Sequence, residues 1–310
     1  MKKIFTHPGF LVIITGALFA GISFSLIATA HGNNVTSSVT VGAATPAITS
    51  LSVNGGSAIT LTAATTTPIS VVATISDANG CSALTGGTTT VLLYRSGITS
   101  STCINSPNPL DCYVATAFTA SSTCSGTSIN TTTTFPVEYF AQATDASSSY
   151  PSQSWLATVD FAAAGGTPTA TADSAGVTLN TLTAINVAPS SINYGTITAG
   201  TNSASTNQNE AVADVGNSST SLQVYAQQTL SSGANSIATS SQVYATSTFT
   251  YPGNSVQLTS AAATVSGFLI PAPASTATDS ASTYWGIGVP AGTPTGTYTG
   301  TNVFMSLFHS

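Results

Sequence analysis

The feature that most constrains this chain is the alternation of apolar and polar residues in short runs bounded by Gly, Asn, Pro and Asp. In one such run Ile69, Val71, Ala73 and Ile75 share one side, because successive side chains of a strand point to opposite faces. Similar runs span residues 48–53, 59–63, 69–75, 89–94, 113–118, 135–143 and 155–161, and then 184–187, 192–197, 210–215, 222–227, 241–250, 256–258, 265–270, 284–289 and 296–307. This pattern is typical of an all-β sandwich fold.

The length and two biased segments set the domain organisation. At 310 residues the chain is longer than a usual single domain, which favours two domains. Residues 31–46 are rich in Asn, Ser, Thr and Gly and are expected to form a flexible lead-in, and residues 163–176 have the composition of a linker. We therefore predict one β-sandwich at 47–162 and a second, different one at 177–310, since no sharp internal repeat is visible.

The N-terminus has the three parts of an export signal. Lys2 and Lys3 precede a mostly apolar stretch over 10–30, which ends in Ala28-Thr29-Ala30, a small-residue cleavage pattern. Residues 1–30 are therefore interpreted as a signal peptide. The alternative is an uncleaved N-terminal anchor, because the stretch is long enough to span a bilayer. Both interpretations predict an extracellular or cell-surface protein, with membrane contact only through an uncleaved N-terminal segment.

Charge is almost absent. Only 4% of the residues are charged, against roughly 25% in an average soluble protein. Beyond Lys3 the single basic residue is Arg95. A chain with one arginine cannot neutralise a run of phosphates, which excludes nucleic acid as a partner and disfavours anionic lipid surfaces.

Several segments resemble bacterial Ig-like surface domains. In the second half these are residues 185–195 (INVAPSSINYG), 213–217 (ADVGN), 285–290 (WGIGVP) and 296–300 (GTYTG). The first half is similar to such modules through Asp77-Ala78-Asn79-Gly80 and the strand of Trp155. The resemblance implies tandem Ig-like sandwiches on a cell surface, and it brings no catalytic residues.

Four cysteines lie in the first half, at Cys81, Cys103, Cys112 and Cys124. An even number in an exported chain predicts two disulfides, whereas zinc is disfavoured because no Cys-x2-Cys pair or histidine partner is present. Three pairings are possible. If consecutive strands alternate in direction, Cys81–Cys124 and Cys103–Cys112 are favoured. An extra strand between 96 and 111 would upset that assignment.

Two binding sites are candidates. Asp77, Asp160 and Asp173 are expected near one end of the first sandwich, where their carboxylates offer oxygen ligands for calcium. The alternative is that Asp77 only forms an Asx turn with Asn79-Gly80 and the others are solvated. Trp285 alternates with Tyr284, so one of the two should face outward. This makes Trp285 a candidate ligand-binding residue, and an aromatic at an interface or sandwich edge is the alternative.

Catalytic chemistry is not indicated. Histidine occurs only at His7, His31 and His309, and no nucleophile elbow, P-loop, Rossmann fingerprint or zinc-protease motif is present. The sequence predicts a non-enzymatic surface or secreted protein with a structural or adhesive role, without a cofactor unless calcium binds. The alternatives are a secreted glycan-binding accessory protein and a subunit of a pilus or surface lattice. The expected partners are other surface proteins, glycans or copies of the chain itself.

Overall fold

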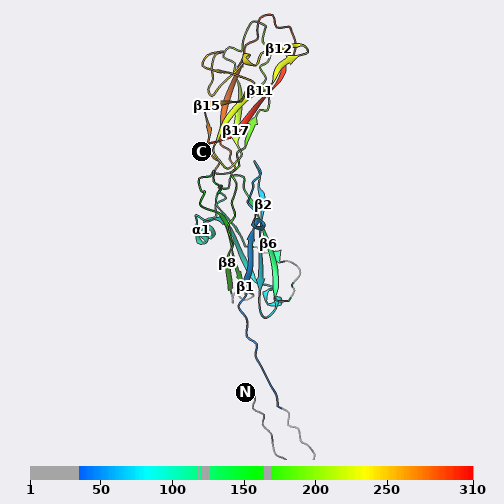
Figure 1. Ribbon diagram of the computed structural model, residues 1–310, viewed down its shortest axis with the longest axis vertical. Coiled ribbons are helices and arrows are strands. Elements are labelled where there is room, and N and C mark those ends of the chain that lie inside the picture. Colours follow the sequence, from blue (N-terminus) through cyan, green and yellow to red (C-terminus); the bar gives the residue numbers. More distant parts are fainter. Residues whose placement is uncertain (1–34, 117–118, 121–123, 125, 164–168, 310) are drawn as a thin grey trace, which may run out of the picture. The chain divides into compact units, whose positions relative to one another are not determined.

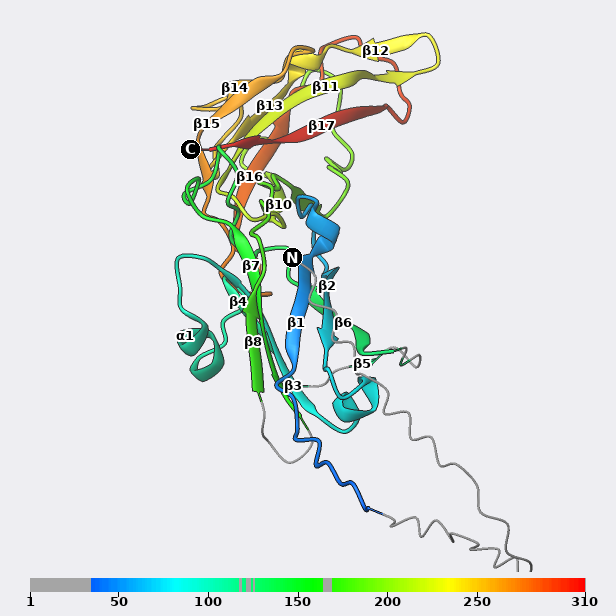
Figure 2. The same cartoon turned by 60° about the horizontal axis from the view of Figure 1, so that its bottom comes forward.

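The first half of the chain forms two facing antiparallel sheets, seen in Figure 1 and visible as two layers with their strands labelled in Figure 2. The computed structural model describes residues 35–116, 119–120, 124, 126–163 and 169–309. One sheet has the order β1 (Ala47–Val53), β2 (Thr67–Ser76), β6 (Ser128–Val137), β5 (Thr119–Ala120). The other has the order β4 (Cys112–Ala115), β3 (Thr88–Arg95), β7 (Trp155–Ala162), β8 (Thr169–Asp173).

The alternating runs supply the core between these sheets. Ile69, Val71 and Ala73 of β2 meet Val91 and Leu93 of β3 in one buried cluster, while the residues between them on β2 are half-exposed. Trp155 opens β7 and is fully buried in the same cluster. Burial of one face of each sheet is what the period-two pattern predicts.

The second half also forms two antiparallel sheets. One has the order β14 (Val256–Gln257), β13 (Gln242–Ala245), β16 (Ser280–Ile287), β10 (Gln208–Asp214), β9 (Ile185–Ala188). In the other, β11 (Thr220–Ser232) pairs with β12 (Asn235–Ile237), β15 (Ala263–Ile270) and β17 (Thr299–Phe308). The chain is thus all-β with four antiparallel sheets in two sandwiches. Short 3-10 turns lie at Asn54–Gly56, Cys81–Leu84 and Thr239–Ser241.

The second core is built around an aromatic group. The ring of Trp285 lies 5.3 Å from that of Tyr244 and 5.5 Å from that of Phe304, measured between centroids. Phe304 comes from β17 and the other two from the facing sheet, so the group joins the two layers. Val212 and Leu222 are buried in the same cluster.

The boundary between the sandwiches differs from the predicted one. The sequence predicts a linker over 163–176, but within it Thr169–Asp173 form β8, which pairs with β7 over Ala162↔Thr169 to Thr158↔Asp173. Val177 and Leu179, placed by the sequence in the second sandwich, are buried in the first core. The small and hydroxyl residues of this segment resemble a linker in composition, yet they suit an edge strand.

The two sandwiches meet at a small apolar cluster. Tyr139, Phe140 and Val215 are buried together, and the N–H of Ala64 donates to the carbonyl of Val215 at 3.1 Å. Both sandwiches belong to the unit Ala43–Ser310, whereas the segment up to Gly42 forms a separate unit.

Asn217 ties this junction together. Its Nδ2 donates to the carbonyls of Ala141 (3.0 Å) and Asn180 (3.2 Å), and its Oδ1 accepts from the N–H of Leu182 at 2.6 Å. One buried side chain therefore satisfies backbone groups of a loop in the first sandwich and of the crossing segment, which is the pattern of a fixed connection.

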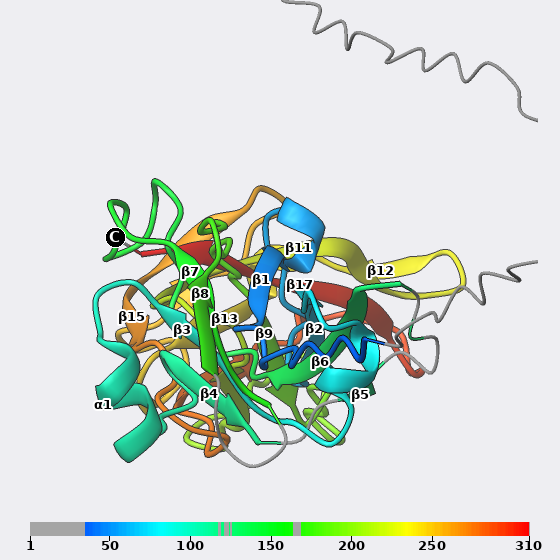
Figure 3. The same cartoon turned by 90° about the horizontal axis from the view of Figure 1, so that it is seen from below.

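Three predicted strands take another form. Residues 192–197 belong to no ladder among the described residues, and the chain turns at Gly195, which has a φ of 72° and donates its N–H to Asn193 Oδ1. From 59–63 only Ile59 bridges, to Leu179. The strand predicted at 135–143 is instead β6, which begins at Ser128 in the Thr-rich stretch and ends at Val137. A short helix, α1 (Ser100–Asn105), lies beside β4 (Figure 3). None of the helices in the described ranges has the length and hydropathy needed to span a bilayer, and the predicted signal at 1–30 lies outside those ranges.

The junction generates a stability prediction. Asn217→Ala removes three hydrogen bonds and leaves two carbonyls and one N–H without their partner, so we expect the free energy of unfolding to fall by about 2–4 kcal/mol. Urea denaturation followed by tryptophan fluorescence measures this. The matched control is Asn130→Ala on the exposed side of β6, where a single bond from the Thr74 hydroxyl is lost and the expected change is below about 1 kcal/mol. Equal losses in the two variants would contradict the assignment.

Candidate functional site

The disulfides form in the pairing that strand alternation favours. Cys81 pairs with Cys124 and Cys103 with Cys112, with Cα–Cα distances of 5.6 and 5.5 Å. The segment between 96 and 111 contains α1 and no strand among the described residues. The extra strand that would have upset the predicted pairing is therefore not formed there. Two disulfides are typical of proteins that fold in an oxidising compartment.

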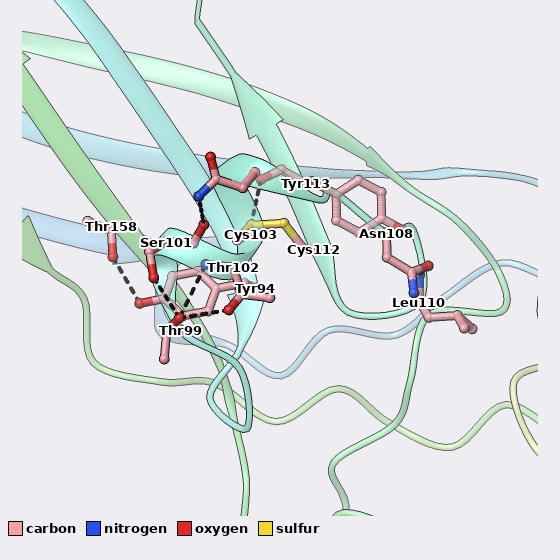
Figure 4. The surroundings of a disulfide bond; sticks show 11 residues. Tyr94, Thr99, Ser101, Thr102, Cys103, Asn108, Leu110, Cys112, Tyr113 and Thr158 are labelled. Carbon is pink, nitrogen blue, oxygen red and sulfur yellow. Dashed lines mark hydrogen bonds between the residues drawn. A yellow bond between two sulfur atoms is a disulfide. The ribbon is translucent and has the colours of Figure 1, made fainter.

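The second bridge holds α1 against the sheet (Figure 4). Cys103 and Cys112 are buried, and the Thr99 hydroxyl caps the helix by accepting from the N–H of Thr102 at 3.2 Å. Below the helix the Tyr94 hydroxyl lies 3.0 Å from that of Thr158. The hydrogen bonds drawn here join the helix and its neighbouring strands, so they serve local structure.

The three aspartates of the predicted calcium site do not assemble. Asp77 accepts from the N–H of Asn79 at 2.7 Å, which is the Asx turn of the alternative interpretation. Asp160 accepts from the hydroxyl of Thr171 at 2.6 Å, and Asp173 accepts from that of Thr158. Across the described residues no group of three or more His, Cys, Asp or Glu side chains is placed to hold a metal ion. Asp160 and Asp173 lie on the paired strands β7 and β8, whereas Asp77 follows β2 of the facing sheet.

Trp285 is a core residue, which corrects its assignment as a ligand-binding residue. Its side chain is fully buried, and its Nε1 donates to the Thr283 hydroxyl at 2.9 Å. Tyr284, half-buried, takes the other face of β16. Alternation correctly separates the two aromatics, but only the facing sheet decides which side of the strand is inside.

The lone arginine is fully engaged. Arg95 Nε donates to Gln142 Oε1 at 2.9 Å, a second nitrogen donates to Gln153, and the guanidinium lies 3.9 Å from the centre of the Tyr150 ring. Its ion pair with Asp111 spans 3.5 Å. With 6% of its surface exposed, Arg95 anchors loops and is not placed to receive an anionic ligand.

One Ser–His contact was not foreseen from the sequence. The Ser221 hydroxyl lies 3.0 Å from Nδ1 of His309, two residues that are 88 positions apart. Among the described residues no hydrogen bond engages Nε2 of this histidine, so the third group that orients the base of a hydrolytic triad is missing from the contact. No signal in the sequence points to this pair, because β11 and β17 come together only in the folded sheet.

The strongest candidate site is a cleft at the β12 end of the second sandwich, with a volume of about 590 Å³. We call it the tyrosine cleft. It is lined by residues 192–199, Leu230, Ile237, Ile287, Val289 and residues 293–298. Among the lining residues Ile237 and Ile287 are buried, and threonines are the most frequent residue type. None of the lining residues carries a charge, so the cleft suits an uncharged partner.

One lining residue, Tyr194, belongs to a small network of polar side chains. The hydroxyl of Tyr194 donates to Gln242 Oε1 at 3.1 Å, and Asn302 Nδ2 donates to the same oxygen at 2.9 Å. Burial raises the pKa of Tyr194, and the nearby Glu210 carboxylate raises it further. The phenol therefore stays neutral and keeps its proton for Gln242.

Glu210 is a buried carboxyl with an unpaired oxygen. It lies on the core side of β10 with 2% of its surface exposed, and its Oε1 has no hydrogen-bond partner. Burial raises the pKa of Glu210 to about 7. Asp214, on the same strand face, is fully buried; burial raises its pKa too, and the hydrogen bond from the N–H of Gly216 lowers it in part.

Comparison with known proteins leaves the family open. No protein family matches the chain, and no curated protein matches it. Among solved structures, the collagen adhesin from S. aureus is similar over 84% of this chain and 92% of that chain, at 10% identity and a TM-score of 0.17. A score of this size carries no argument about family or function.

The two bridges are predicted to contribute unequally to stability. They span 43 and 9 positions in sequence, and loop closure in the unfolded chain gives about 4 kcal/mol for the longer and about 2.5 kcal/mol for the shorter. Chemical denaturation of Cys81→Ala/Cys124→Ala should therefore show the larger loss, with Cys103→Ala/Cys112→Ala as its matched counterpart. The reverse order would mean that packing of α1 outweighs loop entropy.

Glu210 generates a prediction about pH. Its folded pKa of about 7 exceeds its ordinary value of 4.5, so folding favours the protonated form. The stabilisation is complete below about pH 4.5 and is lost as pH rises through about 7, which amounts to a fall on the order of 3 kcal/mol. We expect Glu210→Gln to flatten the curve of unfolding free energy against pH between 5 and 8.

Asp214 contributes in the same direction, because burial raises its pKa as well. Glu210→Gln/Asp214→Asn should therefore remove the slope that the single variant retains. If Glu210→Gln alone kept the full pH dependence of the unfolding free energy seen in the unmodified protein, this would contradict the assignment of that dependence to Glu210.

Proposed function

We propose that the chain is a non-catalytic structural or adhesive protein of the cell surface or the extracellular medium, acting through tandem Ig-like sandwiches. The observation that carries this proposal is the pair of disulfides within the first sandwich, since such bridges persist in oxidising compartments outside the cytoplasm. The predicted export signal at 1–30 supports the same location.

The distribution of charge supports a role in contact. Only 4% of the residues are charged, and the lone arginine is occupied by neighbouring loops. Little like-charge repulsion then opposes the approach of a second surface. The uncharged lining of the tyrosine cleft favours an uncharged protein segment or glycan over an ionic ligand.

The scattered placement of reactive groups supports the non-catalytic part of the proposal. Asp77, Asp160 and Asp173 each accept a hydrogen bond from a neighbour on their own turn or strand pair. The Ser221–His309 contact lacks an orienting third group among the described residues. A hydrolytic site needs nucleophile, base and oxyanion donors aimed at one point, and no such convergence supports an enzyme.

Labelling of intact cells tests this proposal. Cells that express the full chain under its own N-terminal segment are treated with a membrane-impermeant biotin reagent or a protease, and free thiols are counted by intact mass after alkylation. We expect the chain on the surface or in the medium with no free thiol, since all four cysteines are bridged. A chain protected inside the cell with four alkylated cysteines would overturn the proposal. A cytoplasmic reporter protein serves as the control for cell integrity.

A further inference from the structure

A second cleft lies where the two sandwiches meet, with a volume of about 440 Å³. We call it the junction cleft. It is lined from the first sandwich by residues 142–143 and 147–150, and from the rest of the chain by Thr181, residues 217–219, Ala272, Phe308 and His309. In Figures 2 and 3 the loop that leads into β7 lies beside the end of β17. A ligand held in this cleft would therefore contact both sandwiches.

The lining of the junction cleft is polar but carries no acidic residue, lysine or arginine. Ten of its thirteen residues have a hydroxyl, an amide or an imidazole group, whereas the tyrosine cleft is lined by four isoleucines, a leucine and a valine. An ionic ligand would find no opposite charge here, and an apolar side chain would take water away from hydroxyls without replacing their hydrogen bonds. The lining therefore suits a neutral ligand that has many hydroxyls of its own.

The loop of this cleft is held in shape by Asp145. Its Oδ2 accepts from the N–H of Thr181 at 2.6 Å, and its Oδ1 accepts from the Thr181 hydroxyl at 2.7 Å and from the N–H of Ser147 at 3.2 Å. The Ser148 hydroxyl donates to the Asp145 carbonyl at 2.8 Å and accepts from the N–H of Tyr150 at 3.1 Å. A loop that is fixed before binding loses little conformational entropy when a ligand arrives.

The lone arginine supports the aromatic residue of the same loop. The guanidinium of Arg95 covers one face of the Tyr150 ring at 3.9 Å, and Gln142 Nε2 donates to the Tyr150 hydroxyl at 3.4 Å. Since Tyr150 also lines the cleft, its ring offers the cleft either the uncovered face or an edge. The C–H groups on one side of a sugar ring can pack against such an apolar surface.

Three serines of the lining have hydroxyls that are open to a ligand. Among the described residues, no hydrogen bond engages the hydroxyls of Ser147, Ser149 or Ser219, whereas those of Ser148 and Thr181 shape the loop. A serine hydroxyl donates one hydrogen bond and accepts two. Sugar hydroxyls also donate and accept, so the two sets of groups are complementary.

We propose that the junction cleft binds a neutral saccharide, with Tyr150 as the apolar contact and the open serine hydroxyls as hydrogen-bond partners. This inference rests on the proposed function and deepens it by naming the class of ligand and its site. The walls of the site are already fixed to one another, because Asn217 donates to the carbonyl of Ala141 at 3.0 Å.

A glycan array tests the class of ligand. The full chain, recovered after export under its own N-terminal segment, is applied at about 10–100 µM to neutral hexose and N-acetylhexosamine oligosaccharides. Sialylated and sulfated forms of these sugars are printed on the same array. We expect binding to neutral oligosaccharides, with a Kd of about 10 µM to 1 mM when the strongest of them is titrated in a calorimeter. An array without any bound neutral oligosaccharide, or with binding confined to the acidic forms, would overturn the proposal.

Three tryptophan substitutions at exposed positions locate the site. Ser149→Trp fills the junction cleft and should weaken binding of the titrated oligosaccharide at least about tenfold. Ala146→Trp is the matched control, since Ala146 is exposed on the same loop but does not line the cleft; it should change the Kd less than about threefold. Thr196→Trp, in the lining of the tyrosine cleft, should be equally mild. An unchanged urea midpoint shows that each variant is folded. Equal weakening by Ser149→Trp and Ala146→Trp, or loss of binding in Thr196→Trp, would refute the site.

Hydrogen exchange gives a readout that needs no substitution. With the titrated oligosaccharide bound, we expect slower exchange of backbone amides in residues 146–150 and 217–219 and no change in residues 192–198. Slower exchange in 192–198 alone would place the saccharide in the tyrosine cleft and contradict the assignment. A chain that binds no saccharide can still lie on the cell surface with closed disulfides, so this inference and the proposed function can fail separately.

Discussion

The structure depends on the dry contact between the two sheets of each sandwich. In both halves a fully buried tryptophan, Trp155 or Trp285, lies in this contact and has a partner for its indole N–H. An indole buries a large apolar surface but carries one donor that must be satisfied. The first uses the carbonyl of Gln142 and the second the hydroxyl of Thr283, so each core is closed without leaving that donor unpaired.

Outside these cores, the small number of charged residues determines which side chains form hydrogen bonds. With nine carboxylates and one arginine beyond Lys3, hydroxyls and amides make most side-chain hydrogen bonds, as in the Thr158–Asp173 contact and the three bonds of Asn217. Arg95 is used as an anchor for loops. Glu210 and Asp214 are exceptions: both are carboxyls buried on the core side of β10, where burial favours the neutral form. The surface that results is open to contact with other uncharged surfaces.

Much of the fold follows from the sequence because the alternation of apolar and polar residues along a strand can be recognised within a short segment. The strand of Ile69–Ile75 and the cysteine pairing could be derived in this way, the latter because only strand direction is needed to bring Cys81 to Cys124. The junction could not. Val177 and Leu179 carry a pattern that fits either sandwich, and their burial in the first core depends on contacts with Ile59 and Thr144, far away in the chain.

The all-β class and the disulfide framework follow from the sequence alone, since alternation and cysteine order need no tertiary information. Which face of a strand is inside depends on the facing sheet; this places Trp285 in the core and leaves Asp77, Asp160 and Asp173 without a shared metal site. The tertiary structure also decides which strand-like segments find a partner. Residues 192–197 have the alternation of a strand, but pairing is a property of two segments together, and this segment joins no ladder among the residues that the structure describes.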